Sequence, residues 1–116
     1  MSSKKLVMYA RSIPCPYMFI AANILAEFAV PYEEILIDKD EEALENVLHW
    51  TGFLSVPTLI VADEGSILPQ TPPAPLPKGH SPKGVHRGSM ITEPNRYQLM
   101  MWLVEHGFIK PDDEPQ

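Results

Sequence analysis

The distribution of proline constrains the fold of this chain more than any other feature of its sequence. Thirteen of the 116 residues are proline, and six of these fall between residues 69 and 84. Proline fixes the backbone torsion φ and has no N–H donor, so this stretch can form neither a helix nor a central strand. We therefore predict a long surface loop over residues 69–84, partly in the polyproline II conformation. A plain loop insertion is the simpler interpretation, and docking to an aromatic groove of a partner is the alternative.

A strand followed by a helix is predicted before that loop, at the start of the chain. Residues 4–10 form a short apolar run bounded by charge, which is typical of a buried strand. Residues 16–29 repeat apolar side chains at helical spacing. Pro16 suits the first helical turn, where its missing N–H costs nothing. Val30-Pro31 ends the helix, because the residue before proline avoids the helical region.

Strands and helices continue to alternate along the chain. The further predicted elements are a strand at 32–38, a helix from Asp40 to about Trp50, a strand at 59–61, a strand at 66–68 after a turn at 63–65, and a helix that opens over 92–95 and closes at Gly107. The resulting order, β-α-β-α-β-β-α, favours an α/β layered architecture with a short central sheet.

The single cysteine, Cys15, lies at the junction of the first strand and the first helix. A cysteine at a helix N-terminus meets unpaired backbone N–H groups and the positive end of the helix dipole, and both favour the nucleophilic thiolate. A buried structural cysteine is the alternative, since burial is the ordinary use of a free cysteine. The flanking Pro14 and Pro16 at a strand-to-helix turn favour a reactive thiol. One cysteine forms no internal disulfide, so we predict a reducing, cytoplasmic location.

Composition argues against several classes of function. A net charge of −6 and a pI near 5.1 argue against nucleic acid or an anionic membrane as the main partner. No apolar run approaches the roughly 18 residues that a membrane span requires. The four histidines are scattered, with no ligand spacing to Cys15, so we expect no metal. The length predicts a single domain over residues 1–116, with a flexible tail at 111–116.

Two motifs taken together resemble the glutaredoxin family. Residues 15–18, Cys-Pro-Tyr-Met, resemble the family's Cys-Pro-Tyr-Cys at the same strand-to-helix junction. Residues 55–57, Ser-Val-Pro, resemble the family's Thr-Val-Pro. The resemblance covers residues 4–68 and, more loosely, the last helix. It implies a single glutaredoxin-like domain of thioredoxin-like fold, with a central four-stranded mixed sheet and the proline-rich insertion before the last helix.

The resemblance also implies an activity, that of a monothiol thiol–disulfide oxidoreductase. Cys15 would be the nucleophile, and Met18 in place of the second cysteine excludes an internal disulfide. What remains is a monothiol cycle, in which glutathione or another small thiol is the cosubstrate. The implied partners are that thiol and proteins that carry glutathione or other disulfides.

Substrate-binding residues are implied by the same resemblance, and they are Arg11, Pro16, Tyr17, Val56, Pro57 and Thr92. The family's proline at position 57 is cis, which leaves the backbone of Val56 free to pair with glutathione. Arg11 stands four residues before the cysteine, whereas the family has its basic residue three before. The family's Gly-Gly and Ser/Thr-Asp have no match in register. Gly88-Ser89 and Thr92-Glu93 are the nearest equivalents, and Thr92 or Asn95 would present the predicted N-terminus of the last helix to a carboxylate.

Two other functions remain open at this point. Some single-cysteine glutaredoxins carry an iron–sulfur cluster between two protomers, with additional thiols from glutathione, because a cluster needs thiolates. The Cys-Gly-Phe-Ser motif of the best-known carriers is absent from this sequence. The other is a redox-silent interaction module, in which the fold persists and the proline-rich loop binds a partner.

Overall fold

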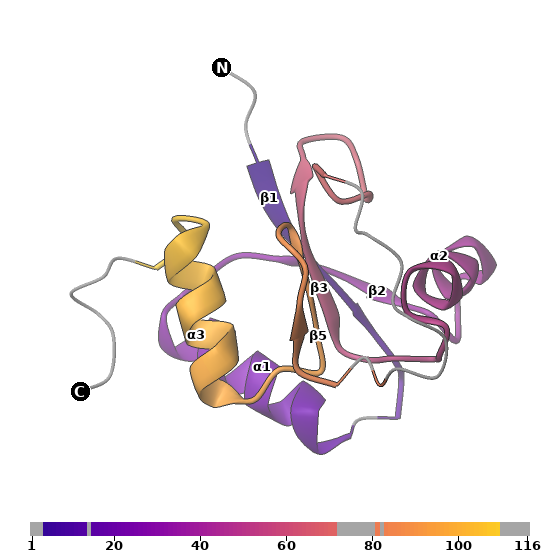
Figure 1. The fold of residues 1–116 in the computed structure, drawn as a ribbon, viewed down its shortest axis with the longest axis horizontal. Coiled ribbons are helices and arrows are strands. Elements are labelled where there is room, and N and C mark those ends of the chain that lie inside the picture. The colour runs from indigo at the N-terminus through magenta and orange to yellow at the C-terminus, as the bar shows by residue number, and fades with distance from the viewer. Residues whose placement is uncertain (1–3, 14, 72–80, 82, 110–116) are drawn as a thin grey trace.

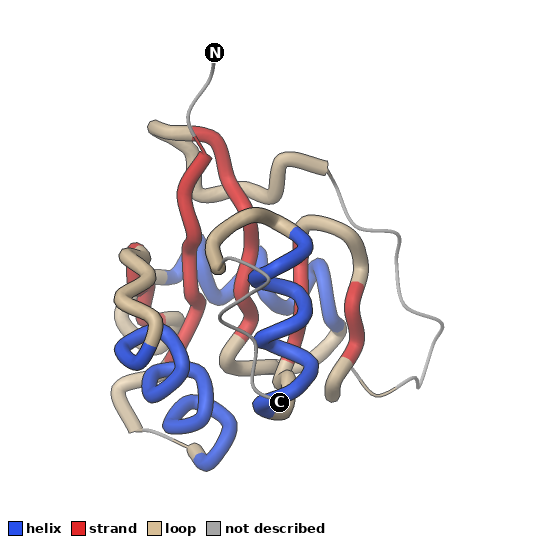
Figure 2. The backbone as a smooth tube through the Cα atoms, turned by 90° about the vertical axis from the view of Figure 1, so that its left-hand side faces the viewer, coloured by secondary structure: helices blue, strands red, loops and turns tan. Residues whose placement is uncertain are grey.

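A five-stranded sheet lies between helices in the computed structural model, which describes residues 4–13, 15–71, 81 and 83–109. The elements in chain order are β1 (Lys4–Ala10), α1 (Pro16–Glu27), β2 (Glu33–Leu36), α2 (Glu41–Thr51), β3 (Thr58–Asp63), β4 (Val85–His86), β5 (Met90–Thr92) and α3 (Arg96–Glu105). The strand order is β2-β1-β3-β5-β4, in which only β1 and β2 are parallel. Helices α1 and α3 cover one face of the sheet and α2 covers the other (Figures 1 and 2). The predicted mixed α/β architecture is confirmed.

The two central strands, β1 and β3, form the middle of the core. Residues 6–10 of β1 and 58–62 of β3 are all buried. Their nearly unbroken apolar sequences suit strands that are covered on both faces by helices. Helix α3 adds the buried Leu99 and Trp102 on one face, while α2 adds Val47 on the other. No helix among the described residues is long and apolar enough to cross a membrane.

The last helix begins later than the sequence predicted. Thr92 is the final residue of β5, where it pairs with Thr58 of β3. Helix α3 starts at Arg96, after the N-cap Asn95, whose side chain accepts a hydrogen bond from Gln98 N at 2.8 Å. The Gln98 side chain in turn accepts one from Asn95 N, which completes a capping box. The prediction that Thr92 lies at the start of this helix is therefore wrong.

The strand predicted at residues 66–68 is also wrong. The chain turns after β3, where Ser66 N donates to the Asp63 carbonyl oxygen at 3.0 Å, but no ladder follows. The edge of β3 is instead occupied by β5, with Leu59 opposite Ile91. The short β4 then adds a fifth strand beyond β5, so the predicted four-stranded sheet has five strands. Most of the predicted loop at 69–84 and all of the tail at 111–116 lie outside the described residues.

Tyr9 carries a phenol group into the interior of the protein. Its side chain is completely buried, and its hydroxyl donates a hydrogen bond to the carbonyl oxygen of Ile67. Its ring meets the ring of Trp50 edge-on, with centroids 5.4 Å apart. Burial raises the pKa of Tyr9 from 10.0 to about 12, because a phenolate is poorly solvated in the core.

We expect this buried phenol to make the protein sensitive to alkali between pH 10 and pH 12. The unfolded tyrosine ionises from about pH 10, whereas the folded one keeps its proton up to about pH 12. This difference in pKa contributes about 2–3 kcal/mol to the free energy of unfolding. The contribution is fully present below pH 10 and is lost as the pH rises from 10 to 12. In urea unfolding across the window, Tyr9→Phe should lose stability less steeply than the wild type. Tyr97→Phe, at an exposed position, should follow the wild type, and identical slopes for all three would refute the assignment.

Candidate active site

Cys15 is the N-cap residue of α1, at the helix terminus that the sequence predicted. Its backbone is extended, with φ −119° and ψ 167°, and its carbonyl oxygen accepts hydrogen bonds from Met18 N at 3.0 Å and Phe19 N at 3.2 Å. Pro16 occupies the first turn and is exposed. The half-buried Cys15 side chain packs against the core. Cys15 therefore stands at the end of α1 whose first backbone N–H groups have no partner within the helix, and its side chain makes no capping hydrogen bond to them.

The second motif folds directly against this thiol. Cys15 Sγ lies 3.6 Å from the carbonyl oxygen of Val56, to which the thiol donates a weak hydrogen bond. The peptide bond between Val56 and Pro57 is cis, and both residues are buried in the connection from α2 to β3. The fold thus joins two motifs that are 41 residues apart in the sequence.

The segment that follows β5 holds the Val56 loop in place. Ser55 Oγ donates to Glu93 Oε2 at 2.9 Å, and Glu93 N donates to the Pro57 carbonyl oxygen at 2.9 Å. Thr58 Oγ1 closes the loop from its other side by donating to the Ser55 carbonyl oxygen at 2.8 Å. Glu93 is a supporting residue that the sequence did not predict, because no local pattern in the sequence links it to Ser55.

Tyr17, the second residue of α1, brings a basic residue to the same region. Its half-buried ring lies under the ammonium group of Lys83, with Lys83 Nζ 5.1 Å from the ring centroid. Such a contact is a cation–π interaction, which is modest in energy at exposed sites. Lys83 is thereby placed beside the helix that begins at Cys15. The sequence offered no reason to select it from the other basic residues.

Two predicted binding residues have less accessible positions than expected. Thr92 is completely buried in β5, and its hydroxyl contacts the Val85 carbonyl oxygen at 3.5 Å. It therefore presents no group to the surface. Arg11 follows β1 and is half-buried, and its Nε is buried without a hydrogen-bond partner among the described residues.

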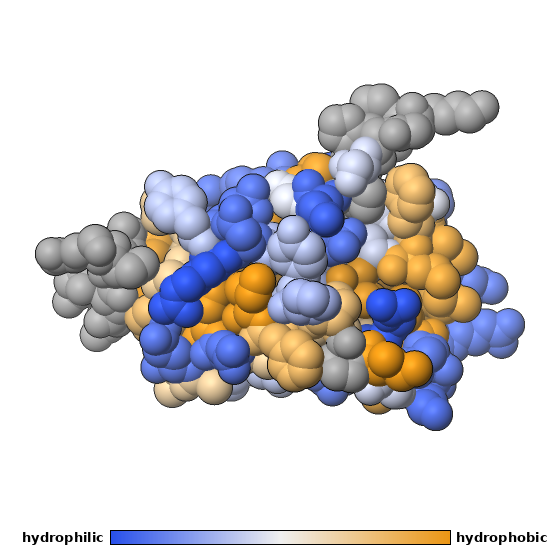
Figure 3. All heavy atoms as spheres, turned by 90° about the horizontal axis from the view of Figure 1, so that it is seen from below, coloured by the Kyte–Doolittle hydropathy of each residue, from blue (hydrophilic) through white to orange (hydrophobic). Residues whose placement is uncertain are grey.

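Exposed apolar side chains flank both segments of the site. Ile13, two residues before Cys15, is 79% exposed, while Phe53 and Leu54, just before the Val56 loop, are 48% and 51% exposed. Figure 3 views the end of the molecule where α1 begins, and apolar patches there alternate with polar ones. Exposed apolar patches with polar surroundings are typical of surfaces that bind other proteins.

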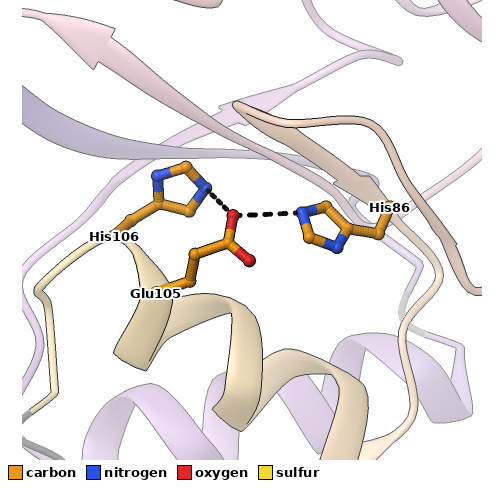
Figure 4. A group of neighbouring side chains, drawn as sticks. All are labelled: His86, Glu105 and His106. Carbon is orange, nitrogen blue, oxygen red and sulfur yellow. Dashed lines mark ion pairs between the residues drawn. The ribbon is translucent and has the colours of Figure 1, made fainter.

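A second group of side chains lies at the C-terminal end of α3. His86, Glu105 and His106 each offer a ligand atom, and these atoms all lie within 4.8 Å of one another (Figure 4). The histidines are scattered along the sequence. No sequence spacing links the three residues, because His86 belongs to β4 and His106 follows α3, so only the fold brings them together.

Comparison with known proteins bears on the first of these two sites. A family model described as Glutaredoxin matches residues 6–65. The match runs from β1 to the end of β3, so it includes Cys15 and the Val56 loop, and it confirms the predicted thioredoxin-like fold. A search of curated proteins finds no match to this chain.

Proposed function

Because the chain belongs to the glutaredoxin family of thiol–disulfide oxidoreductases, we propose that it is a monothiol enzyme that reduces mixed disulfides of glutathione. The observation that carries this proposal is the position of Cys15, at the start of α1 with its Sγ 3.6 Å from the Val56 carbonyl oxygen. A helix N-terminus favours the thiolate, and the backbone of the adjacent Val56 loop is proposed to pair with an extended peptide.

The proposed reaction needs only one cysteine. The Cys15 thiolate attacks the glutathione sulfur of a protein–glutathione mixed disulfide, and the protein thiolate leaves. Cys15 is then joined to glutathione by a disulfide bond. The thiolate of a second glutathione attacks the glutathione sulfur of that bond, which releases glutathione disulfide and restores the Cys15 thiolate. Met18 has a thioether and takes no part in the exchange.

Binding of glutathione is proposed to use the backbone of the Val56 loop and the charges beside it. Glutathione is a peptide with two carboxylates, and an extended peptide can pair with exposed backbone groups. Lys83, above Tyr17, and Arg11, after β1, would attract those carboxylates. The exposed Ile13 and Phe53 would contact the protein part of the substrate.

The test is a steady-state assay on a glutathionylated protein, with glutathione as the reductant. We expect turnover that saturates with both substrates and gives the parallel double-reciprocal lines of a ping-pong mechanism, because glutathione reacts with a covalent intermediate. Free cysteine, used as the reductant at the same concentration, should support slower turnover. Equal rates with the two thiols would reject glutathione as the specific cosubstrate, and no turnover with either would reject the proposed activity.

A charge substitution tests the binding site separately from the chemistry. We expect Lys83→Ala to raise KM for glutathione about two- to fivefold with kcat unchanged, since an exposed ion pair contributes about 0.5–1 kcal/mol. Lys5→Ala is the matched control, because Lys5 is the second residue of strand β1, at the end of the strand remote from Cys15. The same change in KM for both variants would indicate a general effect of net charge and would contradict a specific role for Lys83.

A further inference from the structure

We propose that His86, Glu105 and His106 form a binding site for a divalent transition-metal ion of the zinc type. His86 lies on the edge strand β4, Glu105 is the last residue of α3 and His106 is its C-cap. Figure 4 shows both imidazoles directed at the same oxygen of Glu105. The site lies at the far end of α3 from the start of α1, so it is separate from Cys15 (Figure 1).

The separations between the ligand atoms suit a small tetrahedral ion. Glu105 Oε2 lies 3.4 Å from His86 Nε2 and 3.5 Å from His106 Nε2. Bonds from zinc to nitrogen or oxygen are about 2.0–2.2 Å, so two ligands on a tetrahedral ion stand about 3.3–3.5 Å apart. The two imidazole nitrogens are no more than 4.8 Å apart. Because the His86 and Glu105 side chains are 43% and 53% exposed, a small rotation brings all three atoms to one ion.

His106 is the ligand that the fold holds in position. Its ring packs edge-on against Trp102, with ring centroids 4.9 Å apart, and its side chain is 19% exposed. Its Nε2 lies 2.9 Å from the Gly88 carbonyl oxygen, which also accepts a hydrogen bond from Trp102 Nε1 at 2.9 Å. In the tautomer that hydrogen-bonds to Gly88, the neutral ring carries its proton on Nε2. In the other tautomer the proton is on Nδ1, so Nε2 has a lone pair for an ion and the ring keeps the same number of protons.

The donor set selects the class of ion. Two imidazoles and one carboxylate match a zinc site that keeps one position open, whereas magnesium and calcium prefer oxygen ligands throughout. Glu105 supplies one negative charge against the two positive charges of the ion. The Lys4 ammonium group, which donates a hydrogen bond to the His106 carbonyl oxygen, adds a positive charge beside His106. A surface pocket of about 250 Å³, partly lined by His86, Trp102 and Glu105, gives the ion an entry path and leaves room for a coordinated water.

An ion at this site would join β4 to the end of α3. Strand β4 has only two residues and pairs with β5 at the edge of the sheet. Cross-linking it to α3 would stabilise the part of the chain that follows the proline-rich segment. An ion that binds only the folded state raises the unfolding temperature with its concentration.

The test uses the untagged full chain and cobalt(II), which reports tetrahedral coordination by visible absorption. The chain has two tryptophans, so Trp50→Phe leaves Trp102, beside His106, as the only tryptophan. We expect saturable cobalt absorption, parallel quenching of Trp102 fluorescence, and displacement of cobalt by zinc. His86→Ala and Glu105→Gln should each weaken binding at least about tenfold, the smallest loss expected even for an outer-shell change.

Two control variants separate this site from other metal-binding groups. Cys15→Ser removes the thiol, and His49→Ala removes an exposed histidine on α2, so both should bind cobalt as the wild type does. Both His86 and Glu105 are on the surface, and an unchanged circular dichroism melt in the absence of metal confirms that their variants fold. Absence of saturable binding, loss of binding in Cys15→Ser, or full affinity in the folded His86→Ala variant would each overturn the proposal.

Discussion

Replacement of Cys15 by serine is expected to lower the rate of glutathione-dependent disulfide reduction by at least about a thousandfold. The substitution exchanges one sulfur atom for oxygen and removes the only group that can form the covalent intermediate. Serine is a favoured N-cap residue, so α1 should keep its start and the protein its stability. Steady-state rates, measured alongside thermal unfolding, would separate lost chemistry from lost folding.

Mass spectrometry of the trapped intermediate completes that experiment. Incubation of the wild type with glutathione disulfide should add the mass of one glutathionyl group at Cys15 and release one glutathione, whereas Cys15→Ser should add none. Met18→Leu is the matched control, because it removes the other sulfur of the same helical turn at little cost to packing. It should keep near wild-type turnover. Persistent activity in Cys15→Ser would rule out Cys15 as the nucleophile.

The sequence predicted the centre of the site better than its surroundings. Cys15 and the Val56 loop carry local signals, namely a helix start after a strand and a proline before another strand. Glu93 and Lys83 carry none, since each depends on where the chain returns after the proline-rich segment. A residue that contacts the site only through tertiary structure has no recognisable spacing pattern in the sequence. The group around His86 was not predicted for the same reason.

The fold was predicted well where the hydrophobic pattern is continuous. Both central strands and the first two helices follow from apolar runs and helical spacing. The error at residues 66–68 arose because a short apolar stretch after a turn satisfies the pattern of a hairpin strand. Residues 90–92 have a similar local pattern and occupy the edge of β3. Sequence alone does not decide which of two short stretches pairs with a strand, because the choice depends on long-range packing.

The largest expected loss of stability comes from Trp102, which anchors α3 to the sheet. Its side chain is 1% exposed, and its indole N–H donates to the Gly88 carbonyl oxygen at 2.9 Å. We expect Trp102→Ala to lower the free energy of unfolding by about 3–5 kcal/mol, the usual cost of the cavity that such a truncation leaves. That is a large share of the roughly 5–15 kcal/mol available to a domain. Urea unfolding followed by circular dichroism would measure it.

Trp102→Phe separates the packing of the ring from its hydrogen bond. Phenylalanine keeps most of the buried surface but donates nothing to the Gly88 carbonyl oxygen, which retains His106 Nε2 at 2.9 Å as its partner. The loss should therefore be intermediate, with the hydrogen bond itself contributing about 1 kcal/mol. Tyr97→Ala, at a position of α3 that is 68% exposed, should change stability by no more than about 0.5 kcal/mol. If Trp102→Ala cost no more than Tyr97→Ala, α3 would not be anchored through this side chain, and the ring that orients His106 would have no structural role.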